Sequence, residues 1–301
     1  MPLIYKISPI AFKIGSIEVR WYAICILVGA IIAFLLSKKV FTKNGYEGEI
    51  ADNIVLVALP SGIIGARIWW CLSDAASPWK RGDFWGFITE FNQGGLAIQG
   101  GVLLACVVGI LFLRIRYKQI HPLFLLDAGM PNVLIAQAIG RWGNFFNQEV
   151  YGACVDYSKL NFLPGFIQKQ MQGDMNGNVN VGQYTQYSAY INCQTTQAAI
   201  PLYLVEGVLN TIGFILISLV LRKYWIKGRK QGDLTGLYFV WYGIVRLVLE
   251  PLRNAEFIMD GWGNIPVSVL TSIGFIIIGV LLIVGVRVVP LIINKYKKSN
   301  D

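Results

Sequence analysis

Runs of apolar residues, each close to twenty residues long, recur along the whole chain. They lie at about 20–38, 50–71, 95–113, 123–140, 201–222, 234–252 and 265–289. A helix needs about twenty predominantly apolar residues to cross a bilayer. Only 14% of the residues are charged, against about 25% in soluble domains. The pattern predicts an all-α polytopic membrane protein with about seven transmembrane helices, of which Asp127 and Pro131 interrupt the fourth.

Clusters of basic residues indicate how these helices are oriented. They follow the first, third, fifth and last runs, at 38–43, 114–118, 222–230 and 295–298. Cytoplasmic loops of membrane proteins carry an excess of lysine and arginine. We therefore expect the N-terminus outside and the C-terminus in the cytoplasm, which requires an odd number of spans. The net charge of +9 fits these clusters and contacts with anionic membrane lipid, and does not indicate nucleic-acid binding.

A polar insertion at 150–200 is rich in Gln, Asn, Tyr and Gly. We expect it to form a small extracytoplasmic head between the fourth and fifth spans. The chain then divides into 1–149 with four helices, the head at 150–200, and 201–301 with three helices and a basic cytoplasmic tail. Cys154 and Cys193 bracket the head and could pair in an oxidising compartment, although the pairing stays open. No CxxC motif or His/Cys cluster in the sequence indicates a metal site.

Polar and charged residues also lie within or at the ends of the apolar runs, in the outer half of the predicted bundle. Such residues are costly in a membrane and commonly mark functional sites. Arg246, Glu250 and Arg253 share one helix face because they are spaced i, i+4 and i+7. The full set of candidate site residues is Tyr22, Arg67, Gln99, Arg141, Asn144, Asn147, Glu149, Glu206, Arg246, Glu250 and Arg253.

Each of these residues has a structural explanation when it is taken alone. Tyr22 fits an anchor at the membrane interface, and Arg246 with Glu250 fits an ion pair that holds the bundle together. Taken together, the arginines outnumber the acids nearest to them, Glu149, Glu206 and Glu250. Excess guanidinium in a low-dielectric cavity is costly unless an anion neutralises it, and the planar fork of arginine suits phosphate. The residues therefore predict a cavity that binds a phosphate-bearing lipid.

Residues 140–149 carry a more specific pattern. They read Gly-Arg-Trp-Gly-Asn-Phe-Phe-Asn-Gln-Glu and fit Gly-Arg-x-Gly-Asn-Phe-x-Asn-x-Glu throughout. In this segment the chain resembles the bacterial prolipoprotein diacylglyceryl transferases. Further similarities cover most of the chain apart from much of the head: Ser8-Pro9, Arg20-Trp21-Tyr22, Gly65-Ala66-Arg67, Gly94-Gly95 with Gly100-Gly101, and Tyr242-Gly243 with Arg246, Glu250 and Arg253.

The resemblance implies an enzyme of the bacterial cell membrane. It would transfer the diacylglyceryl group of phosphatidylglycerol to the thiol of the lipobox cysteine in a prolipoprotein signal peptide. A thioether would form and glycerol 1-phosphate would leave, with no metal or other cofactor. A transition state that develops phosphate charge is favoured by clustered guanidinium groups, and a cationic pocket lowers the pKa of an attacking thiol.

The resemblance also implies roles for the individual residues. Arg141 would hold the lipid phosphate, and Arg246 would stabilise charge on the departing phosphate. Asn144 would position the headgroup and Tyr22 would contact it. The other substrate-site residues would be Asn147, Glu149, Arg67, Glu206, Glu250 and Arg253, with the glutamates orienting the arginines.

Two positions depart from the family pattern. Gln99 stands where members commonly carry a histidine that has been cast as the base for the thiol, and glutamine cannot take a proton. Near the fifth span, the pattern His-Pro-x-x-Leu-Tyr-Glu keeps Pro201, Leu204 and Glu206 but loses its histidine and its tyrosine. A catalytically silent relative that binds lipid or signal peptide therefore stays an alternative. An anion transporter is a second, although the inner halves of several spans are almost entirely apolar.

Overall fold

The structure is a computed structural model that describes residues 7–15, 17–73, 77–89, 95, 97–173, 191, 193–194, 196–225, 227–255 and 266–300. It consists of two compact units. One comprises Met1–Leu35 with Gly129–Asp301, and the other comprises Leu36–Ala128. Of the candidate site residues, Arg67 and Gln99 belong to the second unit, and the others belong to the first.

Six helices among the described residues are long and apolar enough to cross a membrane. Five of them are α1 (Trp21–Lys43), α2 (Gly48–Ser73), α4 (Ile98–Arg116), α5 (Pro122–Asn147) and α10 (Val267–Asn300). The sixth joins α7 (Leu202–Phe214), η3 (Ile215–Leu221) and α8 (Arg222–Tyr224). The predicted class, an all-α polytopic membrane protein, is confirmed.

The remaining predicted span coincides with α9 (Asp233–Leu249), which has 17 residues and continues into the short helix η4 (Glu250–Leu252). Its length falls just short of the six helices above, so the count of seven and the orientation of the termini stay predictions. The fourth predicted span is confirmed as α5, which runs unbroken through Asp127 and Pro131 although both interrupt the apolar pattern of the sequence. Helices in membrane proteins tolerate proline where neighbouring groups satisfy the freed backbone carbonyl.

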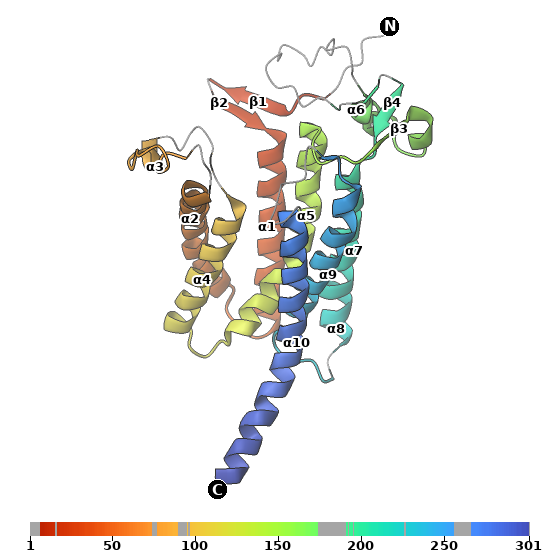
Figure 1. Cartoon of the computed structure of the whole chain (residues 1–301). Helices are drawn as coiled ribbons and strands as arrows, with labels where there is room; N and C mark the ends of the chain where they lie inside the picture. Colours follow the sequence, from red (N-terminus) through yellow and green to blue (C-terminus); the bar gives the residue numbers. More distant parts are fainter. Residues whose placement is uncertain are drawn as a thin grey trace. The chain divides into compact units, whose positions relative to one another are not determined.

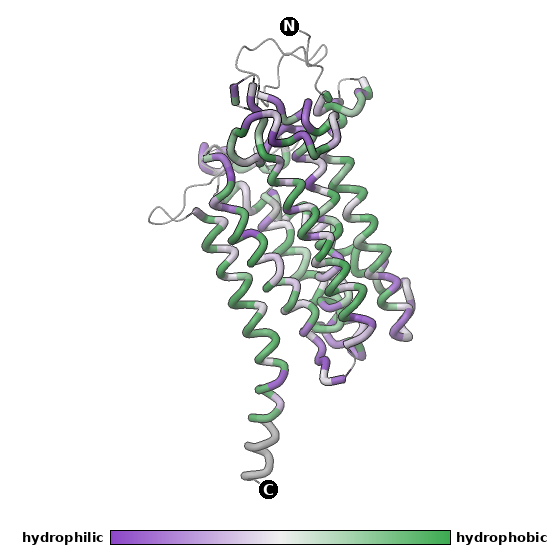
Figure 2. The backbone as a smooth tube through the Cα atoms, turned by 90° about the vertical axis from the view of Figure 1, so that its right-hand side faces the viewer, coloured by the Kyte–Doolittle hydropathy of each residue, from purple (hydrophilic) through white to green (hydrophobic). Residues whose placement is uncertain are grey.

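In the first unit, α1, α5, α7, α9 and α10 lie side by side (Figure 1). Glycines allow close approach between them, as small residues do between membrane helices. A Cβ atom at Gly29 of α1 would lie 2.8 Å from the carbonyl oxygen of Ala136 in α5, and one at Gly236 of α9 would lie 2.8 Å from that of Gly279 in α10. Along these helices the residues are mainly hydrophobic, and the hydrophilic ones gather towards the ends (Figure 2).

The second unit is built on the pair α2 and α4, with the short helix α3 (Gly86–Thr89). Here too the contact depends on glycine. A Cβ atom at Gly65 would lie 2.6 Å from Cβ of Leu104, and one at Gly101 would lie 3.1 Å from the carbonyl oxygen of Gly62. The glycines noted in these two runs of the sequence therefore pack against each other.

A β-hairpin precedes α1. Strands β1 (Ile10–Ile14) and β2 (Ile17–Arg20) pair antiparallel, and α1 begins at the next residue. The backbone N–H of Trp21 donates to the carbonyl oxygen of Pro9 at 3.0 Å, so the hairpin fixes the start of α1. Sequence analysis did not predict this hairpin.

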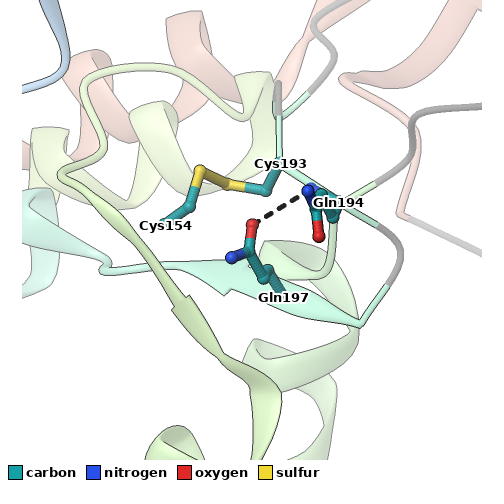
Figure 3. The surroundings of a disulfide bond; sticks show 4 residues. All are labelled: Cys154, Cys193, Gln194 and Gln197. Carbon is teal, nitrogen blue, oxygen red and sulfur yellow. Dashed lines mark hydrogen bonds between the residues drawn. A yellow bond between two sulfur atoms is a disulfide. The ribbon is translucent and has the colours of Figure 1, made fainter.

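The predicted head contains a small folded core. Strands β3 (Cys154–Asp156) and β4 (Gln197–Ala199) pair antiparallel, and η2 (Tyr157–Leu160) and α6 (Gly165–Met171) lie between them in the sequence. Cys154 and Cys193 form a disulfide, next to the Gln194–Gln197 hydrogen bond (Figure 3). The buried cluster of the head includes Phe145 of α5 and Tyr203 of α7, which anchors the head on these helices.

Candidate functional site

The end of α5 carries a chain of side-chain hydrogen bonds. Arg141 and Asn144 lie on one face of the helix because they are three residues apart. Nη1 of Arg141 donates to Oδ1 of Asn144 at 3.1 Å, and Nδ2 of Asn144 donates to Oε1 of Glu149 at 2.8 Å. Nδ2 of Asn147 donates to the same oxygen at 3.2 Å. One amide side chain thus connects the guanidinium of Arg141 to the carboxylate of Glu149.

Glu149 is held by an unusual backbone at the end of this helix. The residues on either side of it, Gln148 and Val150, have φ values of 53° and 59°. Left-handed backbone is uncommon for residues other than glycine, and for a β-branched residue such as valine it is an outlier. The backbone N–H of Glu149 donates to the carbonyl oxygen of Asn144 at 3.1 Å, and the Gln148 side chain donates to the carbonyl oxygen of Gln170 at 2.7 Å. These bonds hold the carboxylate in its place.

Glu206 of α7 is the centre of an arginine cluster. Its side chain is 1% exposed. It accepts a hydrogen bond from Nη2 of Arg141, and its other oxygen lies 3.5 Å from Nη1 of Arg246 and 3.1 Å from Nη2 of Arg253. Three helical elements, α5, α7 and α9 with its continuation η4, therefore meet at one buried carboxylate.

Glu250 is a second carboxylate in the cluster. Its Oε2 lies 3.3 Å from Nη2 of Arg246 and 3.4 Å from Nε of Arg253. Its other oxygen accepts a hydrogen bond from the hydroxyl of Ser268 in α10. Glu250 thus pairs with both arginines of the predicted i, i+4, i+7 set. The shared helix face predicted for the three residues is wrong, because α9 ends at Leu249 and Arg253 follows η4 in extended backbone.

The head contributes to this geometry through the backbone around Arg253. Gly152 forms an antiparallel β-bridge with Arg253, and the N–H of Asn254 donates to the carbonyl oxygen of Tyr151 at 3.0 Å. The N–H of Gly152 donates to the carbonyl oxygen of Ile200 at 2.8 Å, just before α7 begins. The first residues of the head therefore tie the end of α9 to the start of α7, where Glu206 lies.

The charge count differs from the prediction. In the first unit the cluster holds three arginines, Arg141, Arg246 and Arg253, and the same number of glutamates when Glu149 is included, so the predicted excess of arginine is absent there. The donors are nevertheless in surplus. Each guanidinium makes two of the contacts above, which leaves further N–H donors on every one. The side chains of Arg141 and Arg246 are 19% and 15% exposed, more than the 8% of Arg253.

Two tyrosines complete the cluster. A Cβ atom at Gly143 would lie 2.5 Å from Cδ2 of Tyr22, so this glycine makes room for the Tyr22 ring against α5. Tyr22 interacts electrostatically with Glu149 and Arg141. Tyr242 interacts with both carboxylates and with Arg141 and Arg246. Sequence analysis did not include Tyr242 among the site residues, although it lies one helical turn before Arg246.

A sequence model described as prolipoprotein diacylglyceryl transferase matches residues 9–285. The chain belongs to this family. Relatives named phosphatidylglycerol–prolipoprotein diacylglyceryl transferase cover nearly its whole length. The protein of Streptococcus equi subsp. zooepidemicus strain H70 is 38% identical over 278 residues, which are 92% of this chain and 94% of the relative. That of Streptococcus suis strain 05ZYH33 is 38% identical over 281 residues, 93% of this chain and 92% of the relative.

Two of the predicted site residues, Arg67 and Gln99, lie in the second unit. Arg67 is 0% exposed, and it donates to the carbonyl oxygens of Phe87 and Gly86, each at 3.0 Å, and of Gly95 at 3.2 Å. Its guanidinium also lies 4.7 Å from the ring centre of Trp70. Arg67 thus shapes the segment between α2 and α4, and its contact with lipid phosphate stays a prediction. Gln99 lies exposed in the first turn of α4.

No cluster of three or more His, Cys, Asp or Glu side chains suited to a metal ion occurs in the part of the chain that the structure describes. The described residues bring guanidinium, carboxylate, amide and phenol groups to the site. Together these groups can bind an anion, orient it and exchange protons with a neighbouring nucleophile.

Proposed function

We propose that this protein transfers the diacylglyceryl group of phosphatidylglycerol to the lipobox cysteine thiol of bacterial prolipoproteins, forming a thioether and releasing glycerol 1-phosphate. Family membership and the names of the relatives support the reaction and its two substrates. The observation that supports the assignment of the site is the convergence of Arg141, Arg246 and Arg253 on the buried carboxylate of Glu206.

This convergence suits a lipid phosphate. Glu206 holds the three guanidiniums at fixed positions, so the protein bears the cost of bringing them together before substrate arrives. Arg141 and Arg246 then offer their remaining N–H donors to the phosphate oxygens, while Arg253 is more deeply buried. When the thiolate displaces the phosphate ester, charge grows on the leaving group. Preorganised donors stabilise that charge most in the transition state, which accelerates the step.

The other residues position the headgroup. Asn144 is fixed between Arg141 and Glu149, and Tyr22 is fixed against Gly143, so both present polar groups beside Arg141. Asn147 supports Glu149. Glu250 orients Arg246 and Arg253. The reaction would take place at the outer side of the bacterial cell membrane, with the N-terminus outside and the C-terminus in the cytoplasm.

A transfer assay tests the proposal. Purified protein is mixed with phosphatidylglycerol vesicles and a lipobox peptide, and the mass gain on the peptide is followed together with release of glycerol 1-phosphate. We expect both products in equal amounts. Vesicles of phosphatidylcholine and a peptide with serine in place of the cysteine are the controls. The absence of both products from a folded protein would contradict the proposal.

A silent relative that binds lipid or signal peptide is the second candidate, because Gln99 replaces a histidine common in the family. The same assay separates the two. Phosphatidylglycerol that remains bound to the folded protein without any transfer to the peptide would favour the silent relative.

A further inference from the structure

The proposed reaction needs a proton acceptor, and the following inference rests on that proposed function. A cysteine thiol has an ordinary pKa of about 8.5, so most of it is protonated at neutral pH, whereas the thiolate is the nucleophile. Gln99 cannot accept a proton. Tyr22 and Tyr242 are also poor proton acceptors, because a neutral phenol already holds its proton.

The three glutamates of the cluster differ in their partners. Glu206 contacts three arginines and Glu250 contacts two. The oxygens of these two carboxylates are thus occupied by guanidinium groups. Glu149 receives hydrogen bonds from the neutral amides of Asn144 and Asn147, and in the described residues it makes no ion pair with an arginine. It is therefore the carboxylate of the cluster whose oxygens are not occupied by a guanidinium.

Glu149 is also well placed. It is separated from Arg141 by one side chain, Asn144, through hydrogen bonds of 3.1 and 2.8 Å. A phosphate held by Arg141 and a thiol that approaches Glu149 would thus lie on the two sides of this amide. The bonds from Asn144 and Asn147 both end on Oε1, which leaves Oε2 for the thiol. Glu149 is partly exposed, so a substrate can reach it.

The backbone supplies an independent argument. Gln148 and Val150 are the non-glycine residues with left-handed φ in the described chain, and they flank Glu149 directly. Such conformations persist only where the surrounding structure enforces them, and they cluster at active sites. A structural carboxylate at a helix end does not need this strain, because many residues would end the helix more favourably.

We propose that Glu149 is a catalytic residue that accepts the proton of the substrate cysteine thiol. The S–H bond breaks as an O–H bond forms on Glu149. The thiolate then attacks the glycerol carbon that bears the phosphate ester, forming the C–S bond. The C–O bond breaks, and its electron pair leaves with glycerol 1-phosphate. The proton on Glu149 passes to water or to the released phosphate, which regenerates the carboxylate.

The test compares two nucleophiles. Glu149→Gln keeps the size and polarity of the side chain but removes the acceptor. A lipobox peptide with selenocysteine in place of cysteine is already ionised at neutral pH and needs no base. A general base contributes roughly 10²- to 10⁴-fold, so we expect Glu149→Gln to lose a factor in that range with the cysteine peptide. With the selenocysteine peptide the loss should be less than about tenfold, since only the base is missing.

Glu250→Gln is the matched control, because it disturbs the arginines without removing the proposed base. It should slow both peptides by the same factor. If Glu149→Gln does not fold, Glu149→Asp gives the same comparison, since moving the carboxylate should slow the cysteine peptide more than the selenocysteine peptide.

Three outcomes are decisive. Equal losses with both peptides would show that Glu149 only positions other groups, and no loss with cysteine would show that another group takes the proton. Both refute the inference but leave the transfer reaction intact. No product from the unchanged protein with either peptide would instead refute the proposed function.

Discussion

Removing the Cys154–Cys193 disulfide should make the head far easier to open. The bond joins residues 39 positions apart. In the chain-entropy treatment, a loop of about 40 residues loses roughly 13 cal/mol/K of unfolded-state entropy on crosslinking, or about 4 kcal/mol at 25 °C. Each ~1.4 kcal/mol is a factor of ten. We therefore expect Cys154→Ala with Cys193→Ala to raise the open population of the head by up to on the order of a thousandfold.

Trypsin cleavage measures this opening. Lys159 lies in η2 and Lys169 in α6, so cleavage at either requires the head to unfold locally. At low protease concentration the cleavage rate follows the open population. Cys71→Ala is the control, because Cys71 is a buried cysteine of α2 that forms no disulfide, and it should leave the rates at the head unchanged. An increase below about tenfold would refute the reasoning and show that the packed core of the head, without the crosslink, keeps it closed.

Other variants test single contacts. Gly143→Ala should displace Tyr22, because the tyrosine ring lies where the new Cβ atom would go, and it should lower transfer activity at least tenfold. Gly140→Ala is the matched control. Its new Cβ atom would have nothing within 4 Å, so the variant should keep its thermal stability. Gly65→Ala should cost about 1–3 kcal/mol through overpacking against α4, seen as a lower unfolding temperature, and an unchanged temperature would contradict the packing. Gln99→His should leave the pH dependence of turnover unchanged, whereas a new titration near neutral pH would show that a base at this position takes part.

Hydropathy was sufficient to predict the helices but not their details. The predicted runs agree to within a few residues at most ends with α1, α2, α4, α5, α10 and the helix formed by α7, η3 and α8. The largest discrepancy is in α10, where the predicted run ends at 289 and the helix continues to Asn300. The next largest is in α5, where the helix continues to Asn147 and includes most of the signature. Arg141, Asn144 and Asn147 lower the hydropathy after Gly140. In the same stretch Phe145 packs into the buried cluster that the head shares with Tyr203 of α7.

The site could be predicted only as a set of residues. Spacing along the chain grouped Arg246, Glu250 and Arg253, although Arg253 lies beyond the helix in extended backbone. Glu206 was expected to orient arginines, but the sequence could not assign it to Arg141, which lies 65 positions away, because such contacts depend on how the helices pack. For the same reason the sequence did not distinguish Glu149, which binds amides, from the two glutamates that bind arginines.

The partners of Arg67 also could not be predicted from the sequence. Its position in an apolar run suggested an anion site, since a buried guanidinium needs a negative partner. The structure supplies backbone carbonyl oxygens instead, and these belong to the segment between α2 and α4. A count of acidic side chains in the sequence cannot include such partners.

The measurement that tests the proposed phosphate site most directly is the kcat/KM of transfer by Arg141→Ala relative to the unchanged protein. Removing one preorganised donor to developing charge costs about 10²- to 10³-fold, and we predict a loss at least that large, with the head still resistant to trypsin as evidence of folding. A folded Arg141→Ala protein that keeps its activity within a few-fold would contradict the assignment of Arg141 to the lipid phosphate.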